Sequence, residues 1–286
     1  MKINLIDFNK GAVPYFNNHW PVKDLEYVGP FSKWDGITVF TDELCFNPVV
    51  DQIQSKYKIA WSIESPAIKS HFSNHIYLVE NKFDYIYTYT PKSDNQKYKQ
   101  SYFGACWIVE ENCKIYEKTK LLSIVASNKN YAPGHKLRHE IISKNLHKNL
   151  ELWGSGYKWF SDEPEDRLKP FKDYMYVIVV ENCKHPNYFT DKIIDCFASG
   201  CIPIYIGPDL KSYEIPSFLY LQAEPNIGDI RSKINEAKKI NYEEWRESLN
   251  IWLADPKTYE NWSKDLFLTK IINMLQKITN NNHLQP

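Results

Sequence analysis

Residues 174–207 constrain the fold of this chain more than any other stretch. An apolar run at residues 174–180 is rich in β-branched residues and too short for an independent helix, which predicts a buried strand. After a polar loop, a helix is expected to begin at Thr190, a favourable capping residue, and to end at Gly200. A second apolar run at residues 201–207 completes a strand–loop–helix–strand unit. In a parallel crossover of this kind the loop lies at the carboxyl end of the first strand, where open α/β sheets bind ligands.

Basic residues lie in the first turns of two expected helices. Lys192 stands where the helix dipole disfavours a cation by roughly 0.3–1 kcal/mol. The conflict disappears if an anion lies between the lysine and the free N–H groups of the helix start. The helix that begins near residues 133–134 repeats the pattern with His135, Lys136 and Arg138. One ligand with a pyrophosphate group would account for both helix starts, and side chains that simply point into water are the alternative.

Composition excludes several classes of protein. The 35 basic and 35 acidic residues balance, so no global field attracts the chain to nucleic acid or to an anionic membrane. The six cysteines form no CxxC pair and no His/Cys cluster, which indicates reduced thiols rather than a metal site or a disulfide framework. No signal peptide and no apolar stretch of membrane-spanning length is recognised. We therefore expect a cytoplasmic protein, which would have to visit the membrane from the soluble phase, as a peripheral protein, if it works on lipid-linked molecules.

The pattern of apolar runs predicts two α/β halves with a cleft between them. In the first half, strands are expected at residues 3–8, 36–41, 57–63 and 85–89, with a helix at 47–55. In the second half, strands are expected at residues 121–126, 150–153, 174–180, 201–206 and 218–221, with intervening helices that include 227–240. The expected domains are residues 1–118, residues 119–255 and a helical tail at 256–286.

The sequence lacks the usual motifs for binding phosphate through glycines or a metal. Gly154-Ser155-Gly156 lacks the later glycine of GxGxxG, and no Asp-x-Asp metal anchor occurs. We therefore expect a site that holds phosphates with basic side chains and helix starts, without a metal ion and without a cofactor.

Several segments resemble one enzyme family. Glu181-Asn182, then Tyr-Phe-Thr-Asp-Lys at residues 188–192, then Ile-Pro-Ile-Tyr-Ile-Gly-Pro at residues 202–208, resemble in order and spacing the donor-binding signature of the family 10 α-1,3/1,4-fucosyltransferases. Ser127-Asn128 and Glu64-Ser65-Pro66 resemble two further segments of that family. The likeness runs from about residue 57 to about residue 220, and the first fifty residues match no pattern that we can name.

The resemblance implies a GT-B fold, in which two Rossmann-like domains face a cleft and helices follow at the C-terminus. The N-terminal domain would handle the acceptor and the C-terminal domain would bind GDP-fucose. The implied activity is an inverting transfer of fucose to a hydroxyl of a glycan acceptor, lipid-linked acceptors included, with no nucleic acid as partner. Two alternatives remain: a GT-B transferase that uses another nucleotide sugar, and a non-catalytic glycan-binding relative.

The resemblance also implies roles for individual residues. Glu64 would be the general base and Lys192 would hold the pyrophosphate. Arg138 is favoured over Lys136 and His135 as the second phosphate ligand, because a guanidinium can grip phosphate through two N–H groups. Asp191 stands where the family has a glutamate that binds the ribose, and Val180 replaces a phenylalanine, so the nucleotide contact and the pocket near the sugar are the expected points of difference. The remaining donor-site candidates are Asn182, Tyr188, Glu181 and Ser127.

Overall fold

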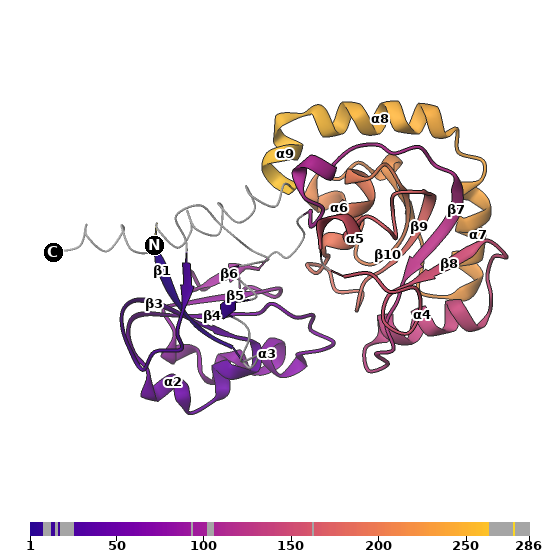
Figure 1. Ribbon diagram of the computed structural model, residues 1–286. Helices are drawn as coiled ribbons and strands as arrows, with labels where there is room; N and C mark the ends of the chain where they lie inside the picture. Colours follow the sequence, from indigo (N-terminus) through magenta and orange to yellow (C-terminus); the bar gives the residue numbers. More distant parts are fainter. Residues whose placement is uncertain are drawn as a thin grey trace. The chain divides into compact units, whose positions relative to one another are not determined.

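The computed structural model describes residues 1–7, 13–14, 17, 26–92, 94–101, 106–161, 163–262 and 277 (Figure 1). The chain divides into two compact units, Met1–Tyr102 together with Asp265–Pro286, and Phe103–Lys264. Each unit contains a parallel sheet with helices, which confirms the expected α/β class. Within the described ranges, no helix is both long and apolar enough to cross a membrane.

The first unit is built on a six-stranded sheet in the order β2-β1-β3-β4-β5-β6, and all of its strand pairs are parallel. Its buried centre is apolar, with Phe40, Val50 and Phe72 inaccessible to solvent. Because β1 pairs with β2 on one side and with β3 on the other, the strand order reverses between β1 and β3. The strands are β1 (Lys2–Ile6), β2 (Glu26–Val28), β3 (Lys33–Thr41), β4 (Gln54–Trp61), β5 (Tyr85–Thr88) and β6 (Tyr98–Gln100).

The short elements of the first unit differ from the expectation. The helix expected at residues 47–55 is wrong in extent, because α2 (Val49–Gln52) has four residues and β4 begins two residues later to pair with β3. The edge strands β2 and β6 were not predicted, since three residues are too few for an alternating pattern to emerge. Phe8, the last residue of the first expected strand, lies outside the described residues. The other helices are the 3-10 helices η1 (Asp42–Phe46), η2 (Ile76–Leu78) and η3 (Glu80–Lys82), and α3 (Ser70–His75).

The second unit is built on a five-stranded sheet in the order β11-β10-β9-β7-β8, again with parallel pairing. The strand expected at residues 218–221 is wrong in part, because residues 217–219 form the 3-10 helix η6 (Ser217–Leu219) directly after Pro216. Two residues of strand follow it and extend the edge of the sheet. The strands are β7 (Lys120–Val125), β8 (Leu150–Trp153), β9 (Tyr174–Val180), β10 (Ile202–Ile206) and β11 (Leu221–Gln222).

Two helices of the second unit begin at the carboxyl edge of this sheet. α4 (Pro133–Ser143) connects β7 to β8, and α6 (Asp191–Ala198) connects β9 to β10 on the other side of β7. Right-handed crossovers that run in opposite directions place these helices on opposite faces, so β7 and β9 flank the switch point where such sheets bind ligands. The remaining helices are η4 (Glu110–Asn112), α5 (Pro164–Arg167), η5 (Lys211–Tyr213), α7 (Ile227–Ala237), α8 (Tyr242–Ala254) and α9 (Pro256–Trp262).

The segment from residue 106 to residue 118 packs with the second unit rather than with the first. Cys106 and Ile108 are buried in the core of the second unit, and Lys118 Nζ donates to the Ser199 carbonyl at 2.7 Å. The division by packing therefore lies before this segment, whereas the sequence pattern put it after residue 118. The charged stretch after Ile108 resembles a linker in composition, but its few apolar side chains fix it to the second core.

We predict that Gly154 cannot be replaced without a large loss of stability. Gly154 has φ +111°, and a Cβ at this position would lie 2.0 Å from the Ala126 carbonyl oxygen. A positive φ costs a residue with a side chain about 1–2 kcal/mol, and overpacking adds about 1–3 kcal/mol. Gly156→Ala is the matched control, because Gly156 has φ +93° but its Cβ would lie 3.9 Å from its nearest neighbour. Guanidinium unfolding should show the larger loss for Gly154→Ala, and equal losses would contradict the close approach.

Candidate functional site

The dipeptide Glu181-Asn182, directly after β9, joins the starts of α4 and α6. The Gly134 N–H donates to the Asn182 carbonyl at 3.0 Å, and a Cβ on Gly134 would lie 1.9 Å from the Glu181 carbonyl oxygen. Only a glycine lets α4 begin this close to the strand end. On the side of α6, a Glu181 carboxylate oxygen accepts the Thr190 N–H at 2.8 Å. The two helix starts predicted from the sequence are therefore neighbours at the switch point.

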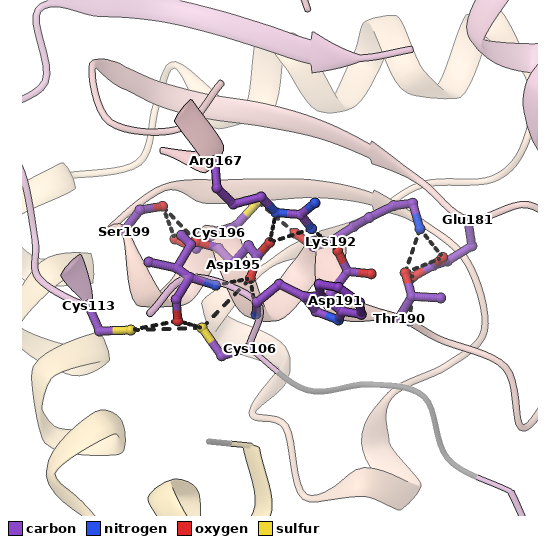
Figure 2. Close-up of polar contacts among 12 residues, drawn as sticks. Cys106, Cys113, Arg167, Glu181, Thr190, Asp191, Lys192, Asp195, Cys196 and Ser199 are labelled. Atoms are coloured by element: carbon purple, nitrogen blue, oxygen red, sulfur yellow. Dashed lines mark hydrogen bonds and ion pairs between the residues drawn. The ribbon is translucent and has the colours of Figure 1, made fainter. Parts of the chain in front are cut away.

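Lys192 is held over the first turn of α6 by Glu181 and Thr190 (Figure 2). The Glu181 side chain is fully buried, and Lys192 Nζ lies 3.4 Å from its Oε2. The Thr190 hydroxyl donates to Glu181 at 3.0 Å and accepts from Lys192 at 2.6 Å. Thr190 is the N-cap residue of α6, as its position predicted, but its side chain makes no capping hydrogen bond to the helix. The anion that offsets the unfavourable position of Lys192 is therefore Glu181, while about a third of the Lys192 side chain stays exposed.

Arg138 is a buried cation in the same place. From α4, its Nη2 donates to the Val180 carbonyl and, at 3.3 Å, to Asn182 Oδ1. No carboxylate within ion-pair distance of Arg138 occurs in the part of the chain that the structure describes. Burial lowers the pKa of Arg138 from its ordinary value and the charge of Glu181 opposes this, but a guanidinium stays protonated at neutral pH. Arg138 and Lys192 are thus two cations that face one carboxylate, Glu181.

The other two basic candidates of α4 differ from Arg138. His135 is buried, and burial followed by the charge of Arg138 lowers the pKa of His135 to about 4. Its Nδ1 accepts the Ala132 N–H at 3.3 Å, so the ring is neutral at pH 7 and adds no charge. Lys136 is exposed. Arg138 is therefore the basic residue of this turn that contacts Asn182, and the assignment of a phosphate ligand among the three stays a prediction.

Asp191 is engaged by an arginine that the sequence did not single out. Arg167 pairs with Asp191 and also, at 3.0 Å, with the buried Asp195 one turn further along α6 (Figure 2). The other carboxylate oxygen of Asp195 accepts the N–H groups of Trp107 at 2.7 Å and Ile108 at 3.2 Å. Arg167 lies in a charged segment without a motif, so no sequence signal marks it.

Tyr188 and Ser127 occupy the loops that follow β9 and β7. Tyr188 is buried, and its N–H donates to the His185 carbonyl at 3.0 Å to close the turn before α6. Ser127 is partly buried, and its Oγ accepts the Lys129 N–H at 3.4 Å. Both side chains therefore belong to the carboxyl edge at which the helix starts lie, and their contact with a donor stays a prediction.

Glu64 lies in the first unit, in the loop after β4, with an exposed side chain on a fixed backbone. Asp42 Oδ1 accepts the N–H groups of Ile63 at 3.0 Å and Glu64 at 3.3 Å, and the Tyr89 hydroxyl donates to the Ile63 carbonyl at 2.8 Å. Burial raises the pKa of Asp42 to about 7. Asp42 was missed, although its position directly after the buried strand at residues 36–41 is a signal that could have found it.

Metal independence and a common cleft for Glu64 and the donor site both stay predictions. In the described ranges no group of three or more His, Cys, Asp or Glu side chains is arranged to hold a metal ion, and metal independence stays a prediction. Glu64 belongs to the first unit and the donor-site candidates belong to the second, so their common cleft also stays a prediction.

Comparison with known sequences identifies the second unit. The family model "Glycosyltransferase family 10 (fucosyltransferase) C-term" matches residues 115–285. The 4-galactosyl-N-acetylglucosaminide 3-alpha-L-fucosyltransferase 9 of Cricetulus griseus is 25% identical over 195 residues, which are 64% of this chain and 52% of the relative. The protein of the same name from Homo sapiens is 24% identical over the same shares. The chain spans about half the length of these curated relatives.

Comparison with solved structures confirms the fold. A crystal structure of an α1,3-fucosyltransferase superposes with a TM-score of 0.61 at 16% identity, covering 98% of this chain and 89% of the other. A structure of an α1,3-fucosyltransferase with GDP-fucose gives a TM-score of 0.51 at 16% identity, covering 98% and 90%. The expected GT-B type of fold, with two Rossmann-like sheets, is confirmed. Because the family model covers more than half of its residues, the chain belongs to glycosyltransferase family 10, the fucosyltransferase family.

Proposed function

We propose that this chain transfers fucose from GDP-fucose to a hydroxyl of a glycan acceptor, with inversion at the anomeric carbon. The observation that carries the proposal is the pair of cations where α4 and α6 begin, Arg138 and Lys192, which face the single carboxylate of Glu181. Membership of family 10 supports the reaction class. The printed names of the relatives, 3-alpha-L-fucosyltransferases that act on 4-galactosyl-N-acetylglucosaminide, support the choice of sugar and of acceptor class.

The pyrophosphate of the donor fits the two helix starts. The first N–H groups of a helix carry a partial positive charge that favours an anion. Lys192 is partly exposed, so its ammonium can reach a phosphate while Glu181 and Thr190 hold the rest of the side chain near the helix start. As the bond between fucose and phosphate breaks, negative charge grows on the leaving GDP. Groups fixed in advance around this charge stabilise the transition state more than the bound donor, which is the requirement for a faster reaction.

Arg138 and Asp191 are proposed to contribute through different parts of the donor. Arg138 is buried, and its N–H groups fix the Asn182 side chain by hydrogen bonds to Oδ1. Its positive charge is proposed to attract the phosphates from within the protein. Asp191 is proposed to accept hydrogen bonds from the ribose hydroxyls. Its ion pair with Arg167 holds the carboxylate in place and still leaves lone pairs on the two oxygens for a ligand.

Glu64 is proposed as the general base. Its carboxylate is exposed to an incoming acceptor, and its backbone is fixed by Asp42 and Tyr89. A base must approach the acceptor hydroxyl to hydrogen-bond distance to take its proton as the oxygen attacks the anomeric carbon. In this scheme basic side chains and helix starts offset the phosphate charge, so the proposed reaction is metal-independent.

A donor screen tests the proposed sugar. The resemblance predicts a glutamate at the position of Asp191. Because the aspartate is shorter, its contact with the nucleotide could differ, and a donor other than GDP-fucose could then be preferred. We expect GDP-fucose to raise the melting temperature more than GDP-mannose, UDP-sugars or CMP-sugars, and to release GDP when 4-galactosyl-N-acetylglucosaminide is added. Stabilisation by a different nucleotide sugar would favour the related transferase, and binding without GDP release would favour the non-catalytic relative.

Replacing Lys192 tests the phosphate site. Lys192→Gln should weaken GDP binding by about 10- to 100-fold in calorimetry, because a hydrogen bond to a charged group contributes about 1.5–3 kcal/mol. Lys184→Gln is the matched control, since this lysine lies in the loop before α6 and pairs at 2.7 Å with the exposed Glu224. Because Lys192→Gln also leaves Glu181 without its cation, the double variant with Glu181→Gln restores a neutral pair. An unchanged dissociation constant in the double variant would remove Lys192 from the site.

Replacing Glu64 tests the base. Glu64→Gln keeps the shape of the side chain but cannot take a proton, so turnover should fall about 100-fold or more while the dissociation constant of GDP stays the same. Glu26→Gln is the control in the same unit, because Glu26 begins β2, and in a parallel sheet the amino and carboxyl ends of the strands lie at opposite edges. Wild-type turnover in Glu64→Gln would show that another group is the base.

A further inference from the structure

Asp42 is a buried carboxyl whose local geometry is unusual. It directly follows β3, one of the two strands at which the order of the first sheet reverses. Its side chain is 7% exposed, and its backbone has φ +43°, in the left-handed region that few residues with a side chain adopt. Residues held in such conformations cost about 1–3 kcal/mol and gather at functional sites. The backbone at Asp42 is therefore a conformation that the surrounding contacts must hold in place.

The hydrogen bonds of Asp42 all reach the loop that carries Glu64. Its Oδ1 accepts from both Ile63 and Glu64, which are 21 and 22 residues further along the chain. The same loop is held from its carbonyl side, since Ser101 Oγ donates to the Ser62 carbonyl at 2.9 Å and Tyr89 donates to the Ile63 carbonyl. The loop backbone is thus fixed by groups from β3, β5 and β6 or the residues directly after them, and the Glu64 side chain extends from it into solvent.

We propose that Asp42 is a positioning residue, which fixes the backbone of Ile63 and Glu64 and thereby directs the Glu64 carboxylate. This inference rests on the proposed role of Glu64. The chemical reason is that a displacement of about 1 Å at a reacting group can cost about 100-fold in rate, so a base on a loop needs its backbone held. One carboxylate oxygen that accepts two successive N–H groups sets both the position and the direction of that backbone.

Burial and the charges near Asp42 determine how its hydrogen bonds to the loop depend on pH. Glu64 raises and Lys69 lowers the pKa of Asp42, and both act less than burial does; Glu43 and the buried Cys45 lie nearby. With the pKa of Asp42 at about 7, the carboxyl gains its charge as the pH rises through neutrality. Hydrogen bonds to a charged acceptor are stronger than those to a neutral one, so the loop is held more firmly above pH 7 than below it.

Two substitutions at Asp42 separate the acceptor oxygen from the charge. Asp42→Ala removes the acceptor and should lower kcat about 10- to 100-fold, on the scale expected for misplacement. Asp42→Asn keeps an acceptor oxygen and suits a left-handed backbone, so kcat should stay within about threefold of wild type. It should also lose the part of the pH dependence of kcat that lies near pH 7. The matched control is Asp84→Ala, which removes a carboxylate that accepts the Lys58 N–H in the middle of β4 at 2.8 Å, and kcat should not change.

A double-mutant cycle with Glu64→Gln distinguishes positioning from a general loss of structure. If Asp42 acts through Glu64, Asp42→Ala should change the residual rate of Glu64→Gln by less than about twofold, because effects of residues that act as a unit are not additive. The amide hydrogens of Ile63 and Glu64 should exchange faster in Asp42→Ala, measured by NMR without any substrate. The affinity for GDP, measured by calorimetry, should stay unchanged.

The outcomes separate this inference from the proposed function. If Glu64→Gln retains full turnover, the base assignment fails, and the exchange of the two amides still decides whether Asp42 holds the loop. If Glu64→Gln is inactive but Asp42→Ala turns over at the wild-type rate, only the role of Asp42 fails. Additive losses in the double variant, or unchanged exchange at Ile63 and Glu64, would also overturn it.

Discussion

The buried carboxylate of Glu181 is the interaction on which the donor-side geometry depends. A carboxylate without exposed surface is stable in a protein only when hydrogen bonds and an opposite charge compensate it. The Thr190 N–H and hydroxyl supply the hydrogen bonds, and Lys192 supplies the charge. This requirement brings Lys192 to the first turn of α6 in spite of the helix dipole. The same residue that explains the position of the lysine thus places a cation beside two helix starts.

Backbone packing determines how close the two helix starts can come. Gly134 lets α4 approach the Glu181 carbonyl to a distance that any side chain would prevent. β7 and β9 are adjacent, and the crossovers that follow them run in opposite directions. The two helix starts therefore meet at the carboxyl edge of the sheet, at the switch point where such sheets bind ligands. Arg138 then reaches from α4 to Asn182, which lies directly after β9. Topology, one glycine and the buried Glu181 thus bring Arg138 and Lys192 to neighbouring helix starts.

The sequence predicted those parts of the fold that are encoded by nearby residues. Residues 174–180 and 150–153 were predicted to the residue, and for residues 174–180 the reason is that an uninterrupted apolar run determines a buried strand. The short strands β2 and β6 were not predicted, because they are strands through their pairing with β1 and β5 rather than through a pattern in their own three residues. The same distinction holds in the site. Lys192 and Asn182 lie in one continuous motif, whereas Asp42 contacts a loop 21 residues away and Arg167 contacts Asp195 28 residues away. Contacts of that kind leave no local pattern to recognise.

Asp191 shows how such distant contacts hold a residue of the continuous motif. Arg167 pairs with Asp191, and Asp195 pairs with the same arginine. Asp195 is itself fixed by the N–H groups of Trp107 and Ile108, which belong to the segment that leads into the second unit. The position of the Asp191 side chain therefore depends on contacts that come from three separate segments of the chain, α5, α6 and residues 107–108, and no single stretch of sequence encodes it.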